Sequence, residues 1–248
     1  MKKWMILGLV FVIGIAGKMG AEEKKLSEAK SASGGEKGLV AYWSFDEGKG
    51  FKVKDLSGKG NDGNIEGEVE WVKGVKGTAL EFNGEAGYVD CGNNSSLDMT
   101  TNDFTVEVWV KSNGYVISSI ISKGSWFDQG SAGYDISFAY NPKNIYFNIY
   151  NGSTYYPLMT SLGEVFPWSH IVGVRRGGRV EVWVNGVKES SVDYPTSSIS
   201  NSENLYIGQK MGGGYFNGLI DEVKIYNRAL TADEIKASYK AVADTLER

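Results

Sequence analysis

The sequence predicts an all-β domain, a two-sheet antiparallel jelly-roll sandwich with a short C-terminal helix. Hydrophobic residues alternate with period two nearly everywhere from Gly38 onward, and the 33 Gly against four Pro are typical of many short strands joined by tight turns. A helical pattern occurs only from Thr231 to about Ala243. A chain of 248 residues that is 42% hydrophobic is long enough for one such domain with a substantial core.

The strands follow from this alternation. The segment 104–111 places Val106 and Val108 on one face and Trp109 on the other, and 144–150 places Phe147 inward. A hairpin is expected around Gly177-Gly178, with Val182 and Val184 also in the core. The remaining strands are expected at about 39–45, 64–71, 78–82, 87–91, 115–122, 133–140, 168–176, 180–186, 187–193, 204–208 and 216–226.

The single helix has its own start signal. Thr231-Ala-Asp-Glu234 is a capping box, in which Thr and Glu side chains satisfy the first free backbone N–H groups. Ile235 and Tyr239 are four residues apart and share one face. A dozen or so short strands followed by one helix favour two packed antiparallel sheets.

The N-terminal residues have a different composition. Met1-Lys-Lys followed by an apolar run from Trp4 to Gly17 is typical of a secretory signal peptide, expected over residues 1–21, and an uncleaved anchor is the alternative. Residues 22–37 are rich in charge, Ser, Ala and Gly, which predicts a flexible charged linker before the domain at 38–243. The expected location is therefore secreted, or at the cell surface or in the periplasm.

Charge and cysteine content narrow the function further. The formal net charge is −4, and Lys and Arg are nowhere concentrated between aromatic residues, so nucleic acid is not an expected partner. The single cysteine, Cys91, cannot form an internal disulfide and is expected as a small apolar core residue. Stability must then come from the core or from a bound metal.

Both ends of the domain resemble a known family. Leu39-Val-Ala-Tyr-Trp-Ser-Phe-Asp-Glu-Gly48 and the segment from Phe216 to Tyr239, FNGLIDEVKIYNRALTADEIKASY, are similar to the first and last strands of the laminin G-like jelly roll, a branch of the concanavalin A-like lectin/glucanase superfamily. Gly77–Gly84, Asp103–Val110, Trp183-Val-Asn-Gly186 and Leu205–Gly208 fall between them in the family's order. The resemblance implies the same fold, and a protein that binds a ligand more often than it converts one.

A structural calcium site is expected near the start of the domain. The segment 55–63, DLSGKGNDG, combines carboxylates and amides with Gly residues, which is the oxygen-rich composition that Ca²⁺ prefers. The resemblance implies that Asp221 on the final strand meets this loop, so the candidate ligands are Asp46, Asp55, Asn61 and Asp221. The alternative is that Asp55 and Asn61 only form Asx turns and Asp46 caps a strand end.

Catalysis is not expected. Laminarinase-type hydrolases of this superfamily carry Glu-x-Asp-x-x-Glu on one strand, whereas the comparable strand here carries only Glu107, followed by Trp109 and Lys111. Retaining glycosidases need two carboxyl groups about 5–5.5 Å apart. His170 is the only His and has no Ser nucleophile motif beside it, so a structural role is expected.

Two surfaces are candidates for ligand binding. Strand alternation turns Trp109, Trp183, Tyr146 and Tyr150 away from the core, where aromatic rings would stack on a sugar if their strands share one sheet. The alternative is that these rings cover the sheet, pack under loops or receive the terminal helix. The rival site is the loop rim, with Trp126, Tyr155, Tyr156 and Tyr215.

Taken together, these patterns predict an exported, non-catalytic binding module, with extracellular carbohydrate as the expected partner and one structural calcium ion. The alternative is a protein–protein adhesion module of the cell surface, and a third interpretation is a relative of glycoside hydrolases or lyases that has lost its activity. Contact with a membrane is expected only through an uncleaved N-terminal anchor.

Overall fold

The computed structural model describes residues 36–114, 117–124, 132–139, 141–161, 168–194, 196–209 and 213–246. Contacts within the chain separate residues Met1–Lys37 from a compact unit, Gly38–Arg248, which contains all the strands described here. No helix among the described residues is long and apolar enough to cross a membrane.

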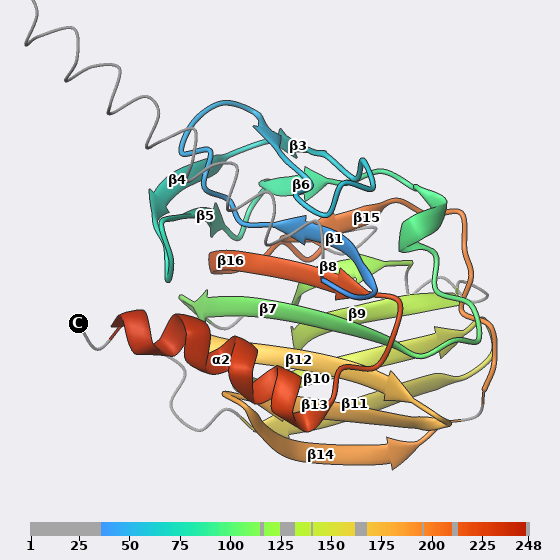
Figure 1. Cartoon of the computed structure of the whole chain (residues 1–248). Helices are drawn as coiled ribbons and strands as arrows, with labels where there is room; N and C mark the ends of the chain where they lie inside the picture. Colours follow the sequence, from blue (N-terminus) through green and yellow to red (C-terminus); the bar gives the residue numbers. More distant parts are fainter. Residues whose placement is uncertain are drawn as a thin grey trace, which may run out of the picture. The chain divides into compact units, whose positions relative to one another are not determined.

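The strands form two antiparallel sheets, as the alternation predicted (Figure 1). Sheet A contains, in spatial order, β14 (Val187–Asp193), β13 (Arg179–Val184), β12 (Ser169–Arg176), β7 (Phe104–Ser112), β16 (Asn217–Tyr226), β5 (Thr78–Asn83) and β4 (Val69–Lys73), with β1 (Leu39–Trp43) also paired to β16. Sheet B contains β11 (Tyr155–Ser161), β10 (Asn141–Asn151), β9 (Ala132–Ala139), β8 (Ser118–Lys123), β15 (Leu205–Ile207), β6 (Tyr88–Asp90), β3 (Gly63–Glu66) and β2 (Lys52–Val53).

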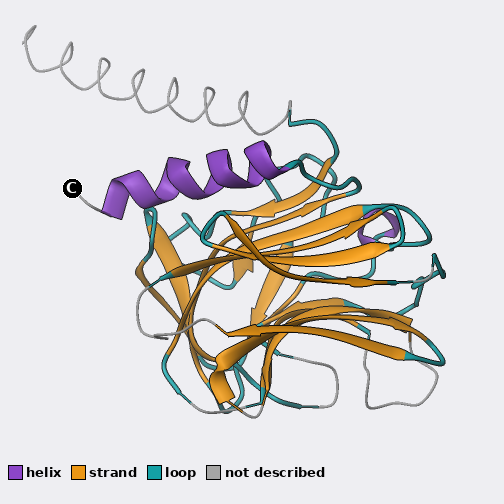
Figure 2. Cartoon of the chain, turned by 90° about the horizontal axis from the view of Figure 1, so that it is seen from below, coloured by secondary structure: helices purple, strands orange, loops and turns teal. Residues whose placement is uncertain are grey.

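The core lies between the two sheets, which Figure 2 shows as stacked layers. Val106, Val108, Phe147 and Val182 are buried there as predicted, and Val184 is half-buried against the same cluster. Cys91 is also buried in this core, and burial raises the pKa of its thiol well above the ordinary value. A compact apolar layer shared by both sheets is the usual solution when each sheet has one apolar face.

Strand β16 has two partners on one side. β5 pairs with residues 217–220 and β1 pairs with residues 223–226, so the neighbour changes at Asp221 and Glu222. The pairing of β16 with β7 is irregular at the same place, and Glu222 has a φ of 49°. Chain segments that follow β1 and precede β5 therefore converge on Asp221, which determines the position of one candidate site.

The predicted hairpin and helix are both present. β12 and β13 pair in register around Gly177 and Gly178, whose φ values of 51° and 83° are those of the tight turn that the right-handed twist of a hairpin favours. Helix α2 (Ala232–Leu246) begins at the capping box: the Thr231 N–H donates to Glu234 Oε2 at 2.7 Å, and the Glu234 N–H donates to Thr231 Oγ1 at 3.3 Å.

Three elements differ from the sequence prediction. The expected strand 64–71 is two strands in different sheets, because the chain turns at Gly67, where a Cβ would lie 2.1 Å from the Ala86 carbonyl oxygen. β2 and β11 were not predicted, since β2 has two residues and β11 contains Pro157 next to a polar end. A short 3-10 helix, η1 (Ser95–Leu97), completes the described elements.

Candidate functional site

The acidic corner, which we define as Asp46, Asp221 and the turn from Gly74 to Thr78, unites two of the four predicted metal ligands. The Asp221 Oδ2 atom accepts the Lys76 backbone N–H at 3.1 Å, and Asp46 Oδ1 accepts the Thr78 N–H at 3.1 Å. A Cβ on Gly74 would lie 2.4 Å from Asp221 Oδ2, and one on Gly77 would lie 1.9 Å from Asp46 Oδ1. The absence of side chains at these two positions lets both carboxylates reach the turn.

Acidic groups outnumber basic ones around the acidic corner, where Lys76 of the turn forms an ion pair with Glu222, its Nζ lying 3.3 Å from Oε1. Burial raises the pKa of Asp221 to about 8, and the nearby Glu222 and Asp46 carboxylates add to this rise against the hydrogen bonds from the Lys76 and Glu222 N–H groups. Burial also raises the pKa of Glu222, although Lys76 and Lys224 oppose the shift. The buried Asp221 and the exposed Asp46 both carry carboxylate oxygens, which are ligands that Ca²⁺ prefers.

The other two predicted ligands, Asp55 and Asn61, form hydrogen bonds with other groups of the protein. The Asp55 carboxylate accepts backbone N–H groups from Tyr42 at 3.0 Å, Ser57 at 2.8 Å and Asn61 at 2.9 Å. The Asn61 amide donates to the Val40 carbonyl at 2.7 Å and exchanges hydrogen bonds with Ser96. Among the described residues no three His, Cys, Asp or Glu side chains group as metal ligands. Asp55 and Asn61 therefore hold a turn, which was the alternative interpretation.

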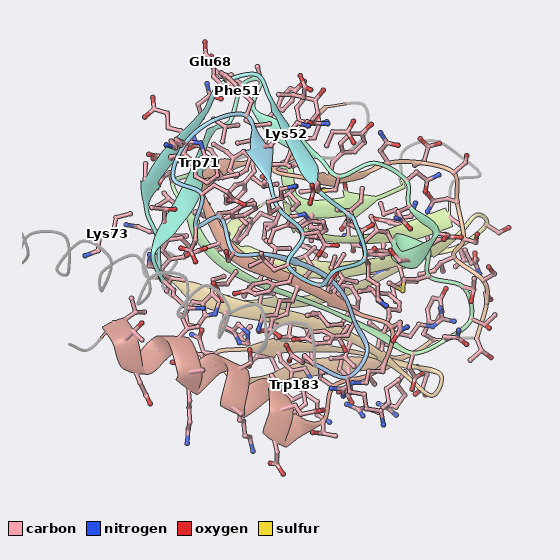
Figure 3. All side chains as sticks on the ribbon, turned by 45° about the horizontal axis from the view of Figure 1, so that its top comes forward. Phe51, Lys52, Glu68, Trp71, Lys73 and Trp183 are labelled. Carbon is pink, nitrogen blue, oxygen red and sulfur yellow. The ribbon has the colours of Figure 1, made fainter. Side chains whose placement is uncertain are left out.

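The expected aromatic face of sheet A is covered. Trp109 and Trp183 do point away from the sandwich core, but their side chains are 1% and 6% exposed. Trp109 stacks on Tyr239 of α2, with ring centroids 5.7 Å apart and planes at 14°, and Trp183 lies in an apolar cluster with Ile235 of α2. Figure 1 shows α2 lying along this sheet, and Figure 3 shows Trp183 beside the helix. The prediction that these two rings line a solvent-exposed face is wrong, because the amphipathic helix buries them.

A buried polar cluster fixes the helix on this face. Glu107 Oε1 lies 3.1 Å from His170 Nε2 and accepts a hydrogen bond from Ser238 of α2. Burial alone would raise the pKa of Glu107, but Lys224, His170 and Ser238 together lower it to about 2. Both Glu107 and His170 are buried beneath the helix, so this arrangement positions α2 and does not face a substrate.

Tyr146 and Tyr150 lie on the other sheet, so the four predicted aromatics do not form one platform. Both tyrosines are on β10, which is a strand of sheet B, and their side chains lie on the outer face of that sheet. The Tyr150 hydroxyl donates to Asp135 Oδ2 at 2.8 Å, while Asp135 Oδ1 accepts from Ser137 Oγ at 3.1 Å and from the Asn148 amide. Tyr146 is half-buried on the same face. Tyr150 thus belongs to a buried hydrogen-bond network.

The outer face of sheet B carries a continuous polar row. In this row, residues on neighbouring strands lie side by side, and their sequence neighbours Val53, Ile65, Val89, Ile207 and Ile136 point into the core. The row consists of Lys52, Asn64, Asp90, Tyr206, Ser122, Asp135 and Asn148. Its centre is buried, with Asp135 2% exposed, whereas Asn64 and Lys52 at one end are exposed.

Three tyrosines gather near the exposed end of this row. The ring centroids of Tyr88 and Tyr206 are 5.7 Å apart, and those of Tyr88 and Tyr215 are 6.4 Å apart. Of these, only Tyr215 was predicted. The alternation in Leu205-Tyr206-Ile207 already turns Tyr206 outward, but the order of strands in sheet B, with β15 beside β6, is what brings it next to Tyr88.

The rest of the predicted loop rim is not placed. Trp126 lies outside the described residues, and for Tyr155 and Tyr156 only the backbone of β11 is described. Other surface features lie at the β2–β4 end of the sandwich, where Figure 3 shows Phe51, Lys52, Glu68 and Trp71. Phe51 is 78% exposed, and the neighbouring Gly50 carbonyl accepts the Trp71 indole N–H at 3.0 Å.

Solved structures show the same fold. The binding domain of Paraclostridial mosquitocidal protein 1 aligns with a TM-score of 0.68 at 20% identity, covering 82% of this chain and 52% of that one. Domain 4 of AbnA, an extracellular arabinanase from Geobacillus stearothermophilus in complex with arabinotriose, aligns at 0.64 and 21% identity, covering 80% and 97%. The binding domain of botulinum neurotoxin DC in complex with rat synaptotagmin II aligns at 0.66 and 13%, covering 83% and 52%.

This chain therefore spans about half the length of the two toxin binding domains and nearly all of the arabinanase domain. No curated protein matches the sequence. The model of the concanavalin A-like lectin/glucanases superfamily named Laminin_G_3 matches residues 83–236, which is more than half of the chain. The blocks Asp103–Val110, Trp183–Gly186 and Leu205–Gly208, which resemble the laminin G-like jelly roll, lie inside this match, and the chain belongs to the concanavalin A-like lectin/glucanase superfamily.

Proposed function

We propose that this chain is an exported, non-catalytic module that binds extracellular carbohydrate at the exposed end of the polar row on the outer face of sheet B. The observation that carries the proposal is the difference between the two outer faces. Helix α2 covers Trp109 and Trp183 on sheet A, whereas sheet B carries the polar row and the tyrosines beside it. Hydroxyl, amide and carboxylate groups next to aromatic rings match the alternating hydroxyls and C–H faces of a sugar.

The similar structures support this proposal at the level of fold. Domain 4 of AbnA is described with arabinotriose, and the mosquitocidal and neurotoxin domains are binding domains. The test is a glycan array probed with the purified domain, followed by calorimetric titration of each positive glycan. Binding of at least one glycan class supports the proposal. Binding to none of them, by a folded protein, overturns it.

A protein partner is the second candidate, because one surface favours it. Phe51 is 78% exposed on a segment that also carries Lys49 and Lys52, and exposed large apolar side chains are frequent at protein interfaces. The neurotoxin DC binding domain is described with synaptotagmin II. Crosslinking on intact cells should separate the two candidates: a Phe51→Ala variant would lose a protein partner attached through this surface and would keep glycan binding.

We also propose that a calcium ion occupies the acidic corner as a structural ligand. Asp46 and Asp221 would hold it together with backbone carbonyls of the converging segments, and the proposal is supported by the approach of both carboxylates to the same turn, at Thr78 and Lys76. The ion would join the segment after β1 to β16. This two-carboxylate site replaces the four-residue site expected from the sequence, because Asp55 and Asn61 are committed to a turn.

The calcium proposal is tested by thermal unfolding with calcium and with chelator. A ligand that binds only the folded state adds about 2.7 kcal/mol at a hundredfold excess over its dissociation constant. The difference between the two conditions should disappear in Asp46→Asn and Asp221→Asn and persist in Asp193→Asn, which changes an exposed carboxylate on β14. An unchanged melting temperature in the unsubstituted protein would refute the site.

Export is proposed from the N-terminal segment alone, since Trp4–Gly17 has the length and flanks of a signal peptide. Expression with the full N-terminus, followed by cell fractionation and intact-mass measurement, tests it. A mature protein that begins after Ala21 in the exported fraction is the expected result. A full-length protein that stays with the cytosolic fraction would contradict export.

A further inference from the structure

The tyrosine patch, which we define as Tyr88, Tyr206 and Tyr215, is assembled from three separate segments. Tyr88 lies on β6, Tyr206 on the neighbouring β15, and Tyr215 just before β16. The Tyr88 and Tyr206 rings meet edge to face with planes at 80°, and the Tyr88 and Tyr215 rings are tilted by 34°. All three side chains are half-buried. Each ring is therefore supported by the protein and still has surface in contact with solvent.

The backbone under the patch holds these rings firmly. Tyr206 stands between the buried Leu205 and Ile207, and Tyr88 precedes the buried Val89. Tyr215 forms an isolated antiparallel β-bridge with Gln209, and its neighbour Phe216 is buried in the core. Rings anchored by core residues lose little conformational entropy when a ligand binds, so more of the contact energy appears as affinity.

Polar groups border the patch at a fixed position. The Asp90 carboxylate accepts the Asn204 amide at 3.0 Å and the Gly92 N–H at 2.8 Å, which orients it next to Tyr206, its partner in the strand register. Asn64 lies opposite Asp90 on β3 and is exposed. Carboxylate and amide groups held beside aromatic rings can accept and donate hydrogen bonds to sugar hydroxyls.

The charge around the patch selects among sugars. Burial raises the pKa of Tyr88 and of Tyr206, and Glu66, Asp90 and Glu203 add to these shifts because their carboxylates are nearby. Glu66 is the cross-strand partner of Tyr88, and Asp90 is the cross-strand partner of Tyr206, so these carboxylates would repel an anionic sugar at the patch and would not repel a neutral one.

We propose that Tyr88, Tyr206 and Tyr215 form the subsite that stacks a neutral sugar ring, with Asp90 and Asn204 contacting its hydroxyls. This inference rests on the proposed carbohydrate-binding function and adds the residues and the class of sugar. Uronic and sialic acids are excluded from the subsite by its acidic border. The exposed end of the polar row, from Asp90 to Lys52, gives a longer oligosaccharide room to continue across β3 and β2.

The experiment titrates the domain with arabinotriose, cellotriose, mannotriose and trigalacturonate, together with any glycan that the array identifies. Each of the three tyrosines is replaced by Ala and, separately, by Phe. Phe keeps the ring and removes only the hydroxyl, so it separates stacking from hydrogen bonding. Tyr146→Ala is the matched control, because Tyr146 is a half-buried tyrosine on the same face of sheet B. Thermal unfolding of every variant verifies that it is folded.

We expect a neutral sugar to bind and trigalacturonate not to bind. Each Ala variant should weaken binding by roughly tenfold, and each Phe variant by no more than about twofold, because the ring supplies the contact. Tyr146→Ala should leave affinity unchanged. In ¹³C-tyrosine NMR spectra, the signals of the tyrosine patch should shift on addition of the sugar while that of Tyr146 stays in place.

The outcomes separate this inference from the function on which it rests. Glycan binding that survives all three Ala substitutions, or that prefers trigalacturonate, overturns the subsite and leaves the carbohydrate-binding function standing. A folded domain that binds no glycan in the panel or on the array overturns both. If an Ala variant fails to fold, the NMR shift of that tyrosine in the unsubstituted protein still decides whether its ring contacts the sugar.

Discussion

Replacing Trp109 by Ala should detach helix α2 from sheet A. Trp109 is 1% exposed and stacks on Tyr239 of the helix. A buried Trp removes about 150–250 Å² from water, which corresponds to about 4–6 kcal/mol at 25 cal/mol per Å². Measured Trp→Ala changes in protein cores are about 3–5 kcal/mol. Since an isolated helix of this length is marginal in water, α2 should lose its structure when its docking surface is weakened.

The assay combines urea unfolding with hydrogen exchange of the α2 amides. We expect the free energy of unfolding to fall by about 3–5 kcal/mol and the exchange protection of α2 to fall with it. Trp71→Ala is the control, because it also removes a Trp ring but lies on β4 away from the helix contacts. A loss below about 1 kcal/mol with α2 still protected would refute the packing argument. Loss of glycan binding at unchanged stability would instead restore Trp109 as a ligand platform.

Three further predictions follow from the same packing. Gly77→Ala should destabilise the protein more than Gly50→Ala. Both glycines have a positive φ, so both substitutions cost about 1–2 kcal/mol of left-handed strain, but only a Cβ at Gly77 would clash with Asp46, at 1.9 Å. Equal losses of stability by thermal unfolding would contradict this prediction. Because the pKa of Glu107 is about 2 when folded and 4.5 ordinarily, its stabilisation is present above pH 4.5 and is lost as the pH falls towards 2. The urea midpoint should therefore drop across that window in the unsubstituted protein and drop less in Glu107→Gln. Parallel curves would count against the lowered pKa of Glu107. Val182→Asp places an unpaired charge in the core and should abolish soluble folding, and a well-folded variant would argue against the sandwich.

Local sequence patterns were sufficient to predict most of the fold. The alternation in 104–111 and the Gly177-Gly178 turn each depend on residues a few positions apart, so β7 and the β12–β13 hairpin are present where expected. The split of 64–71 into β3 and β4 could not be read in the same way. It depends on the close approach of Gly67 to Ala86, which lies outside any local window.

The structure brings together two of the four expected metal ligands, Asp46 and Asp221, and the calcium ion itself stays a prediction. The oxygen-rich composition of 55–63 does not by itself indicate a cation site, because the same residue types also form turns. Whether a carboxylate is used by neighbouring N–H groups, as in Asp55, or converges with another carboxylate, as in Asp46 and Asp221, depends on how β1, β5 and β16 meet.

The proposed binding face shows most clearly what local sequence patterns cannot predict. Alternation correctly turned Trp109 and Tyr146 away from the core, because the side-chain period of a strand is a property of its backbone. The strand period contains no information about which sheet a strand joins or what covers its outer side. The order of strands placed Tyr146 on sheet B and Tyr88 beside Tyr206, and the docking of α2 through Tyr239 and Ser238 buried Trp109. These contacts join residues far apart in the chain, and only the packing of the two sheets and the helix brings them together.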